Sequence, residues 1–140
     1  MTNEPTYSSP EAKRFFTWFD GVCERAEKSP VGKMLRPNGW QIAHTGGGCL
    51  AWQFDRADEK FYVWITYGGD GLGERVRKPD NSARFAVGLY GADGGWINPP
   101  EIVGLSKAMA WCDVALADPA RCMAEAIAKD WPREPFAEAE

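Results

Sequence analysis

One short segment contains the residue types that could do chemistry. It reads His44-Thr45-Gly46-Gly47-Gly48-Cys49 and includes the only histidine of the 140-residue chain. Backbone N–H groups of consecutive glycines can approach an anion closely, and a histidine near a cysteine can activate it as a nucleophile. Neither a nucleophile-elbow motif nor the lysine of a P-loop accompanies these glycines. We therefore favour a hairpin turn whose glycines supply positive φ. The alternative is a small enzyme or an anion-binding site at His44, Gly46, Gly47, Gly48 and Cys49.

A second glycine-rich stretch, Gly68-Gly69-Asp70-Gly71-Leu72-Gly73, follows a predicted strand. Its spacing is not that of a dinucleotide-binding loop, and Pro79 prevents a helix directly after it. We expect residues 68–84 to form a long, mobile loop. Its cluster Arg75, Arg77 and Lys78 makes this the only mildly basic region of the chain and could contact an acidic partner.

The other chemistry-bearing residues do not form a recognisable site. Asp55, Asp58 and Glu59 lie in one charged turn, whereas a glycosidase needs two carboxylates across a cleft. The cysteines lack metal-ligand spacing and are expected to be reduced structural thiols; they are Cys23, Cys49, Cys112 and Cys122. We predict no metal site and no cofactor.

Aromatic residues are the most unusual feature of the composition, at 13% with seven tryptophans. Trp52, Tyr62, Trp64 and Tyr90 alternate along neighbouring predicted strands. They could form a platform for a partner's side chains or for nucleic-acid bases. The competing interpretation is a core covered by helices on both faces of the sheet.

The elements that must position these residues are strands with period-2 alternation. Trp40–Thr45, Cys49–Asp55 and Phe61–Tyr67 are predicted to form an antiparallel meander. Arg84–Tyr90 adds a fourth strand, and Trp96–Ile97 a short fifth one after an Asp-Gly turn.

Helices are predicted before and after these strands in the sequence. Ser9-Pro10-Glu11 begins one that ends at Ser29-Pro30, with Trp18 off its apolar stripe and exposed. Two more precede and follow Asp118-Pro119. The prediction is an α+β single domain over residues 1–140, in which a four- to five-stranded antiparallel sheet carries the N- and C-terminal helices on one face. Residues 1–8 and 133–140 are expected to be loose. The expected core consists of Phe15, Phe19, Ile42, Leu50, Val63, Ile65, Val87, Leu89, Met109, Leu116 and Ile127.

The charge balance restricts the partners. Sixteen basic and twenty acidic side chains give a net charge of −4, which disfavours binding to a phosphate backbone. No apolar run approaches the roughly 20 residues of a membrane span, and the N-terminus lacks the features of a signal peptide. We expect a cytoplasmic protein that does not bind membranes.

Three short motifs point to a group of proteins. The hairpin His44–Ala51, the strand end Ile65-Thr66, and Val87-Gly88-Leu89-Tyr90 followed by Asp93-Gly94 resemble a group of small phage and prophage proteins. The resemblance covers roughly residues 40–95. It implies the cytoplasm of a bacterial host and an accessory role, and it transfers no catalytic residue.

The sequence therefore predicts a non-enzymatic protein that binds another protein. Its expected contact residues are Trp52, Tyr62, Trp64, Arg75, Arg77 and Lys78. The resemblance implies a modulator or inhibitor of a host protein or defence complex, in the manner of an anti-CRISPR protein. The alternatives are an enzyme or ligand binder at the glycine turn and, third, a single-strand nucleic-acid binder on the aromatic face.

Overall fold

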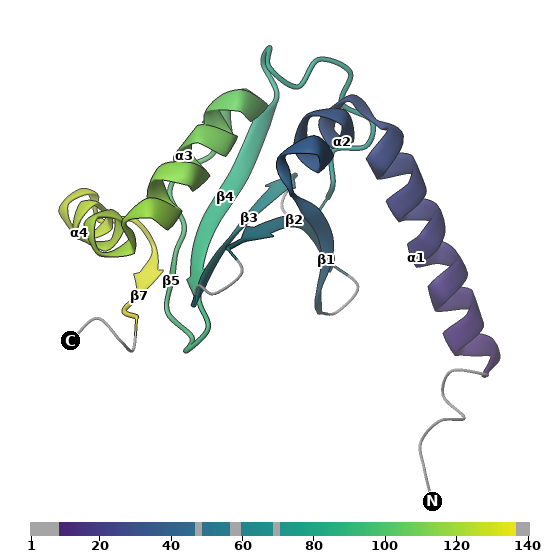
Figure 1. Ribbon diagram of the computed structural model, residues 1–140, viewed down its shortest axis with the longest axis horizontal. Helices are drawn as coiled ribbons and strands as arrows, with labels where there is room; N and C mark the ends of the chain where they lie inside the picture. The colour runs from purple at the N-terminus through teal and green to yellow at the C-terminus, as the bar shows by residue number, and fades with distance from the viewer. Residues whose placement is uncertain (1–8, 47–48, 57–59, 69–70, 137–140) are drawn as a thin grey trace, which may run out of the picture.

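The chain folds into one antiparallel sheet with helices on one side of it (Figure 1), which confirms the predicted α+β class. The computed structural model describes residues 9–46, 49–56, 60–68 and 71–136. Its sheet has seven strands in the order β1-β2-β3-β4-β5-β7, with β6 paired to β4. The strands are β1 (Gln41–Gly46), β2 (Cys49–Asp55), β3 (Phe61–Tyr67), β4 (Arg84–Gly91), β5 (Trp96–Ile97), β6 (Ile102–Val103) and β7 (Arg133–Glu134).

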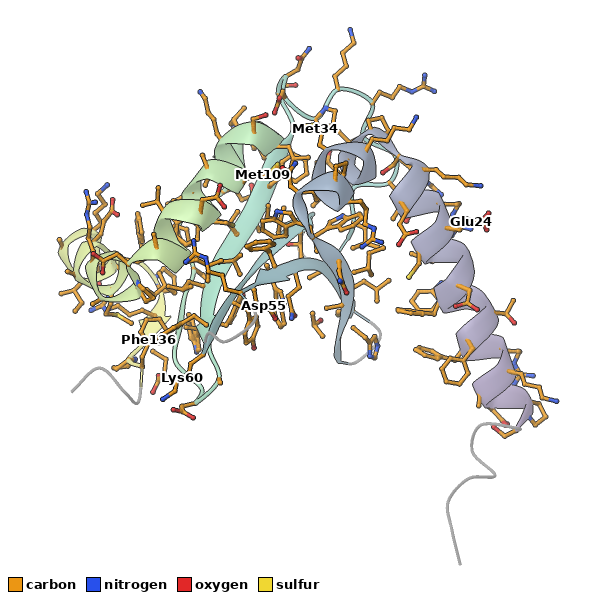
Figure 2. The ribbon with its side chains drawn as sticks, viewed as in Figure 1. Glu24, Met34, Asp55, Lys60, Met109 and Phe136 are labelled. Carbon is orange, nitrogen blue, oxygen red and sulfur yellow. The ribbon has the colours of Figure 1, made fainter. Side chains whose placement is uncertain are left out.

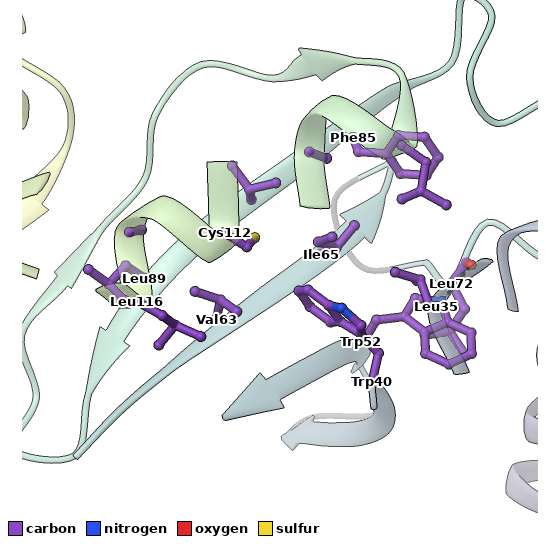
Figure 3. Packing of buried hydrophobic residues seen from close by; sticks show 14 of the residues in the cluster. Leu35, Trp40, Trp52, Val63, Ile65, Leu72, Phe85, Leu89, Cys112 and Leu116 are labelled. Atoms are coloured by element: carbon purple, nitrogen blue, oxygen red, sulfur yellow. Dashed lines mark hydrogen bonds between the residues drawn. The ribbon is translucent and has the colours of Figure 1, made fainter. Parts of the chain in front are cut away.

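Strand register divides the sheet into two faces of different chemistry. Trp52 lies opposite Ile65, and Ile65 lies opposite Val87, so these apolar side chains share one face. On the other face Gln53 lies opposite Trp64, which in turn lies opposite Gly88. The helices lie on one side of the sheet (Figure 1), and this is the Trp52 side, because their buried residues Leu35 and Cys112 belong to the same core cluster as Trp52 (Figure 3). We call the other side the open face; it carries Gln53, Tyr62, Trp64, Thr66, Gly88, Tyr90 and Trp96.

Helix α3 (Leu105–Ala117) packs on the β3–β4 half of the apolar face, and α4 (Pro119–Lys129) contacts α3 and β5. Cys112 of α3 is fully buried near Val63 and Leu89 (Figure 3). Cys122 of α4 is also buried, as expected for structural thiols, and burial raises its pKa to about 11. Ile127, which we predicted to be in the core, is instead 58% exposed. The helix turns Cys122 and Ala126 inward, so the predicted face of α4 was wrong by part of a turn.

Helices α1 (Pro10–Lys28) and α2 (Pro30–Leu35), with the short 3₁₀ helix η2 (Arg36–Asn38), lie at the β1 end of the sheet. Ser29 ends α1 and caps α2, because its hydroxyl accepts a hydrogen bond from the Gly32 N–H at 3.1 Å. In α2, Val31 and Leu35 are fully buried against the core. Figure 1 shows that α1 runs outward from this corner, beside the sheet and beyond β1.

The apolar stripe of α1 is only partly covered by the rest of the protein. Val22, near its C-terminal end, is buried, but the predicted core residues Phe15 and Phe19 are only half-buried. Trp18 is 46% exposed, as the sequence predicted.

The described residues between β3 and β4 form no helix or strand apart from an isolated bridge between Tyr67 and Gly71. It is nevertheless attached to the body of the protein. The Leu72 carbonyl accepts a hydrogen bond from Trp52, and the Asp80 carboxylate accepts two from Ser106 at the start of α3, both 2.6 Å long. These contacts attach Leu72 and Asp80 to the body of the protein, and the mobility that we predicted for residues 68–84 stays a prediction.

The C-terminal residues also differ from expectation. Arg133 and Glu134 pair with β5, and Phe136 is buried with its ring 4.9 Å from that of Phe61. The predicted loose N-terminus, residues 1–8, and the final residues 137–140 lie outside the described part of the chain.

Candidate binding face

Three aromatic rings form a continuous cluster on the open face. The ring of Tyr90 lies 4.4 Å from that of Trp64 and 5.5 Å from that of Tyr62, and the two tyrosines are stacked. Strand pairing produces this contact, because β3 and β4 place Tyr62 directly opposite Tyr90, with Trp64 two residues further along β3. All three rings are half-buried, so each keeps part of its surface in contact with solvent.

Hydrogen bonds fix the two ends of this cluster. Trp64 Nε1 donates to Gln53 Oε1 at 2.7 Å, and Tyr90 Oη donates to Asn98 Oδ1 at 3.2 Å. Burial, with a smaller contribution from Tyr62, raises the pKa of Tyr90 to about 12. The phenol therefore stays protonated at neutral pH and remains a donor to Asn98.

A cavity of about 390 Å³ opens beside Trp64 and Tyr90. It is lined by residues of β2, β3 and β4, by Thr45 of β1, and by Asn98 and Pro99, which follow β5. None of the described residues that line it is charged. They are Thr45, Cys49, Leu50, Ala51, Trp64, Thr66, Ala86, Val87, Gly88, Tyr90, Asn98 and Pro99. The cavity therefore suits an uncharged group that combines apolar surface with hydrogen-bonding capacity.

Because Gly88 has no side chain, Tyr90 and Asn98 can approach each other over β4. A Cβ atom at this position would lie 2.6 Å from Tyr90 Oη and 2.7 Å from Asn98 Oδ1. Any larger residue would therefore push these side chains out of their present positions. The cluster depends on a glycine that the sequence alone marks only as an interruption of a strand.

Trp52 is not part of this face, so its predicted role in partner binding was wrong. Its side chain lies on the helix-covered side, where it is 1% exposed and donates from Nε1 to the Leu72 carbonyl at 3.0 Å. Figure 3 shows the ring among core residues next to Leu35 and Leu72. The period-2 alternation of β2 had already separated Trp52 from Gln53, but which face would be covered depends on where the helices pack.

The histidine and cysteine of the glycine turn are also separated. His44 lies opposite Leu50 on the helix-covered side, and its ring contacts Phe15 and Phe19 of α1 at 5.6 and 6.4 Å between centroids. Cys49 instead lines the cavity on the open face. Because the two side chains point to opposite faces of the sheet, they cannot act together as base and nucleophile. Gly46 ends β1, whereas Gly47 and Gly48 lie outside the described residues.

The predicted basic residues Arg75, Arg77 and Lys78 are exposed but lie apart from the aromatic cluster. They line a separate shallow pocket of about 530 Å³ that also includes Tyr67. This pocket and the cavity beside Trp64 share no lining residue. The structure therefore supports two distinct surfaces where the sequence suggested one.

Sequence reasoning identified Tyr62, Trp64 and Tyr90 but missed the residues that complete the cavity, chiefly Gly88, Asn98 and Pro99. Asn98-Pro99-Pro100 reads only as a strand-breaking segment in the sequence. Residues two apart in a strand lie on the same face, so the position of Gly88 two residues before Tyr90 was a sequence signal that Gly88 belongs to the face of Tyr90.

The described residues contain no group of three or more His, Cys, Asp or Glu side chains placed to hold a metal ion. In the same part of the chain no helix is long and apolar enough to cross a membrane. Comparisons of the chain with protein-family models, with curated proteins and with solved structures find no significant match.

Proposed function

We propose that this chain is a binding protein that recognises a protein partner through the open face, with Trp64 and Tyr90 at the centre of the contact. The observation that carries this proposal is the cluster of half-buried rings beside an uncharged cavity, on a side of the sheet that no described helix covers. Tryptophan and tyrosine are the residues most enriched at the energetic centres of protein interfaces.

The chemistry of the open face supports a protein partner over a nucleic acid. Asp55 lies opposite Tyr62, and Glu134 lies opposite Trp96, so acidic side chains border the tyrosine end of the cluster. A single-stranded nucleic acid needs basic residues beside its stacking platform. The basic residues Arg75, Arg77 and Lys78 line a different pocket.

A small uncharged molecule is the second candidate ligand, because the cavity of about 390 Å³ lies in the size range of small-molecule sites. The sheet face around the cavity extends beyond any such molecule, which favours a partner with a larger contact area. The inhibition of a host protein or defence complex, which the resemblance to phage proteins implies, stays a prediction about which partner is bound.

Affinity purification with a set of matched variants tests the proposal. Trp64→Ala removes the central ring, and Gly88→Ala displaces Tyr90 and Asn98 without deleting a side chain. Val114→Ala is the control, because Val114 is 59% exposed on α3, on the opposite side of the sheet. A true partner binds the wild type and the Val114→Ala variant equally and binds Trp64→Ala at least about tenfold more weakly.

Circular dichroism of each variant establishes that the fold is retained before binding is compared. The proposal is wrong if every partner recovered binds Trp64→Ala and Gly88→Ala as tightly as the wild type. Titration of the tryptophan fluorescence of the wild type and of Trp64→Ala with uncharged small molecules distinguishes the second candidate, because the difference between the two proteins reports on Trp64 among the seven tryptophans. A ligand that saturates the signal while no protein partner depends on Trp64 would favour small-molecule binding.

A further inference from the structure

We propose that an acidic segment of a protein partner binds a second surface of this chain, the shallow pocket of about 530 Å³ on the segment between β3 and β4. We call it the basic pocket; the described residues that line it are Tyr67, Arg75, Val76, Arg77, Lys78, Asn81, Ser82 and Ala83. It shares no lining residue with the cavity beside Trp64, so the inference does not depend on the proposal for the open face. Three observations support it: positive charge without a partner, apolar surface beside that charge, and a hydrogen-bonded backbone.

The first observation is that the positive charge of the basic pocket is not neutralised by the described part of the chain. Arg75, Arg77 and Lys78 are exposed, and among the described residues none of them forms an ion pair. In Figure 2 the segment that carries them passes above Met34 and Met109, and side chains that end in nitrogen project from it away from the sheet. Guanidinium groups match the geometry of carboxylates, so the pocket suits an acidic ligand.

The acidic residues next to these three cations in the sequence are already bound elsewhere. Glu74 forms an ion pair with Arg25 of α1 at 3.1 Å. The Asp80 carboxylate accepts hydrogen bonds from the N–H and the hydroxyl of Ser106. No acidic side chain is among the described residues that line the basic pocket. In a chain with a net charge of −4, the positive charge therefore stays concentrated at this one surface.

The second observation is apolar surface inside the same pocket. The ring of Tyr67 lies 5.5 Å from that of Phe85 and leaves the residue 40% exposed. Val76 and Ala83 are half-buried beside it. A ligand that fits this surface combines carboxylates with apolar groups, as an acidic peptide does. A phosphate backbone is less suitable, because the acidic balance of the whole chain repels it.

The third observation is that the backbone of the basic pocket has hydrogen-bonding partners. The Lys78 carbonyl accepts from the Asn81 N–H at 3.1 Å, which closes a turn inside the pocket. The Pro79 carbonyl accepts from the Leu105 N–H at 3.0 Å, which connects this turn to the start of α3. A surface whose backbone is already bonded in this way loses less conformational entropy when a ligand binds.

NMR titration of the isotope-labelled full chain with the peptide Glu-Glu-Leu-Glu-Glu, at about 50 mM salt, tests the proposal. We expect saturable shifts of backbone amides within residues 75–83 and a Kd below about 1 mM. The peptide Gln-Gln-Leu-Gln-Gln has a similar shape without the charges and should bind at least about tenfold more weakly. The variant Arg75→Gln/Arg77→Gln/Lys78→Gln should weaken binding of the glutamate peptide at least about tenfold, because three surface charge pairs are lost.

The variant Lys13→Gln/Arg14→Gln/Arg121→Gln is the matched control. It also removes one exposed lysine and two exposed arginines, but none of them lines the basic pocket. It should bind the glutamate peptide within about twofold of the wild type. The amide spectrum of each variant shows directly whether the fold is retained.

The absence of saturable shifts up to about 2 mM peptide overturns the proposal. An equal loss of binding in the two triple variants also overturns it, because the peptide would then respond only to net charge. Tighter binding of single-stranded oligothymidine than of the glutamate peptide at the same amides would assign the basic pocket to nucleic acid instead. All the variants leave Trp64 and Gly88 unchanged, so each of these failures is distinguishable from a failure of the open-face proposal.

Discussion

Replacement of Trp52 by phenylalanine tests the assignment of the two sheet faces. Trp52 is 1% exposed and is the only described side chain that donates a hydrogen bond to the Leu72 carbonyl. Phenylalanine keeps an aromatic ring in the core but removes this donor. The carbonyl of Leu72, itself 3% exposed, would then be buried without it.

The magnitude follows from two additive costs. An unsatisfied buried carbonyl costs about 1–3 kcal/mol, and the smaller ring leaves unfilled volume that costs about 1–2 kcal/mol more. The sum, about 2–5 kcal/mol, is a large part of the 5–15 kcal/mol that stabilises a typical domain. A loss of about 3 kcal/mol in a chain of this length lowers Tm by about 10 °C.

Urea unfolding of the wild type, Trp52→Phe and Trp64→Phe measures this difference. Trp64→Phe is the matched control, because its indole N–H bonds to Gln53 on the half-exposed open face, where water can replace it. We expect a loss of less than about 1 kcal/mol for Trp64→Phe. If both variants unfold at the same urea concentration as the wild type, the buried hydrogen bond does not stabilise the fold as argued.

Two further predictions concern Asp80 and Tyr90. Asp80→Ala removes the acceptor for both Ser106 hydrogen bonds at the start of α3 and should cost about 1 kcal/mol in urea unfolding at pH 7. The Ser106 hydroxyl and then its N–H hold the pKa of Asp80 below its usual value. The stability that Asp80 contributes is therefore complete above pH 3.8 and is lost as the pH falls through the lowered pKa. A stability difference between the wild type and Asp80→Ala that persists unchanged at about pH 2 would contradict this prediction. Because the pKa of Tyr90 is raised to about 12, its contribution to stability is complete below pH 10 and is lost as the pH rises through 12. The phenolate absorbance of the wild type minus that of Tyr90→Phe should therefore show a midpoint near 12, whereas a midpoint near 10 would mean that the ring is not shielded from water.

Local sequence patterns were sufficient to predict most of the secondary structure. The helix from Pro10 to Lys28 has a Ser cap at one end and Ser29-Pro30 at the other, and both signals act through neighbouring residues. The three strands of the meander and the hairpin after β4 follow from alternation and turn residues in the same way. The period of a strand placed Tyr62 and Trp64 on one face, whereas the register between β3 and β4 brought Tyr90 to that face and the packing of the helices removed Trp52 from it.

The predictions that failed depended on contacts between distant segments. Ile127 matched a helical stripe with Met123 and Ala126, but the orientation of α4 buries Ala126 together with Cys122 and leaves Ile127 exposed. His44 and Cys49 were adjacent to the same turn, yet the pairing of β1 with β2 sent them to opposite faces.

The sequence by itself determined that this protein has a sheet with aromatic residues on both faces. Only the tertiary structure decided that the helices pack on the Trp52 face of the sheet and leave Trp64 on the open face. The physical reason is that alternation fixes which residues share a face, whereas burial depends on which face the helices can pack against. That choice is set by contacts between distant parts of the chain, such as the hydrogen bond from Trp52 to the Leu72 carbonyl.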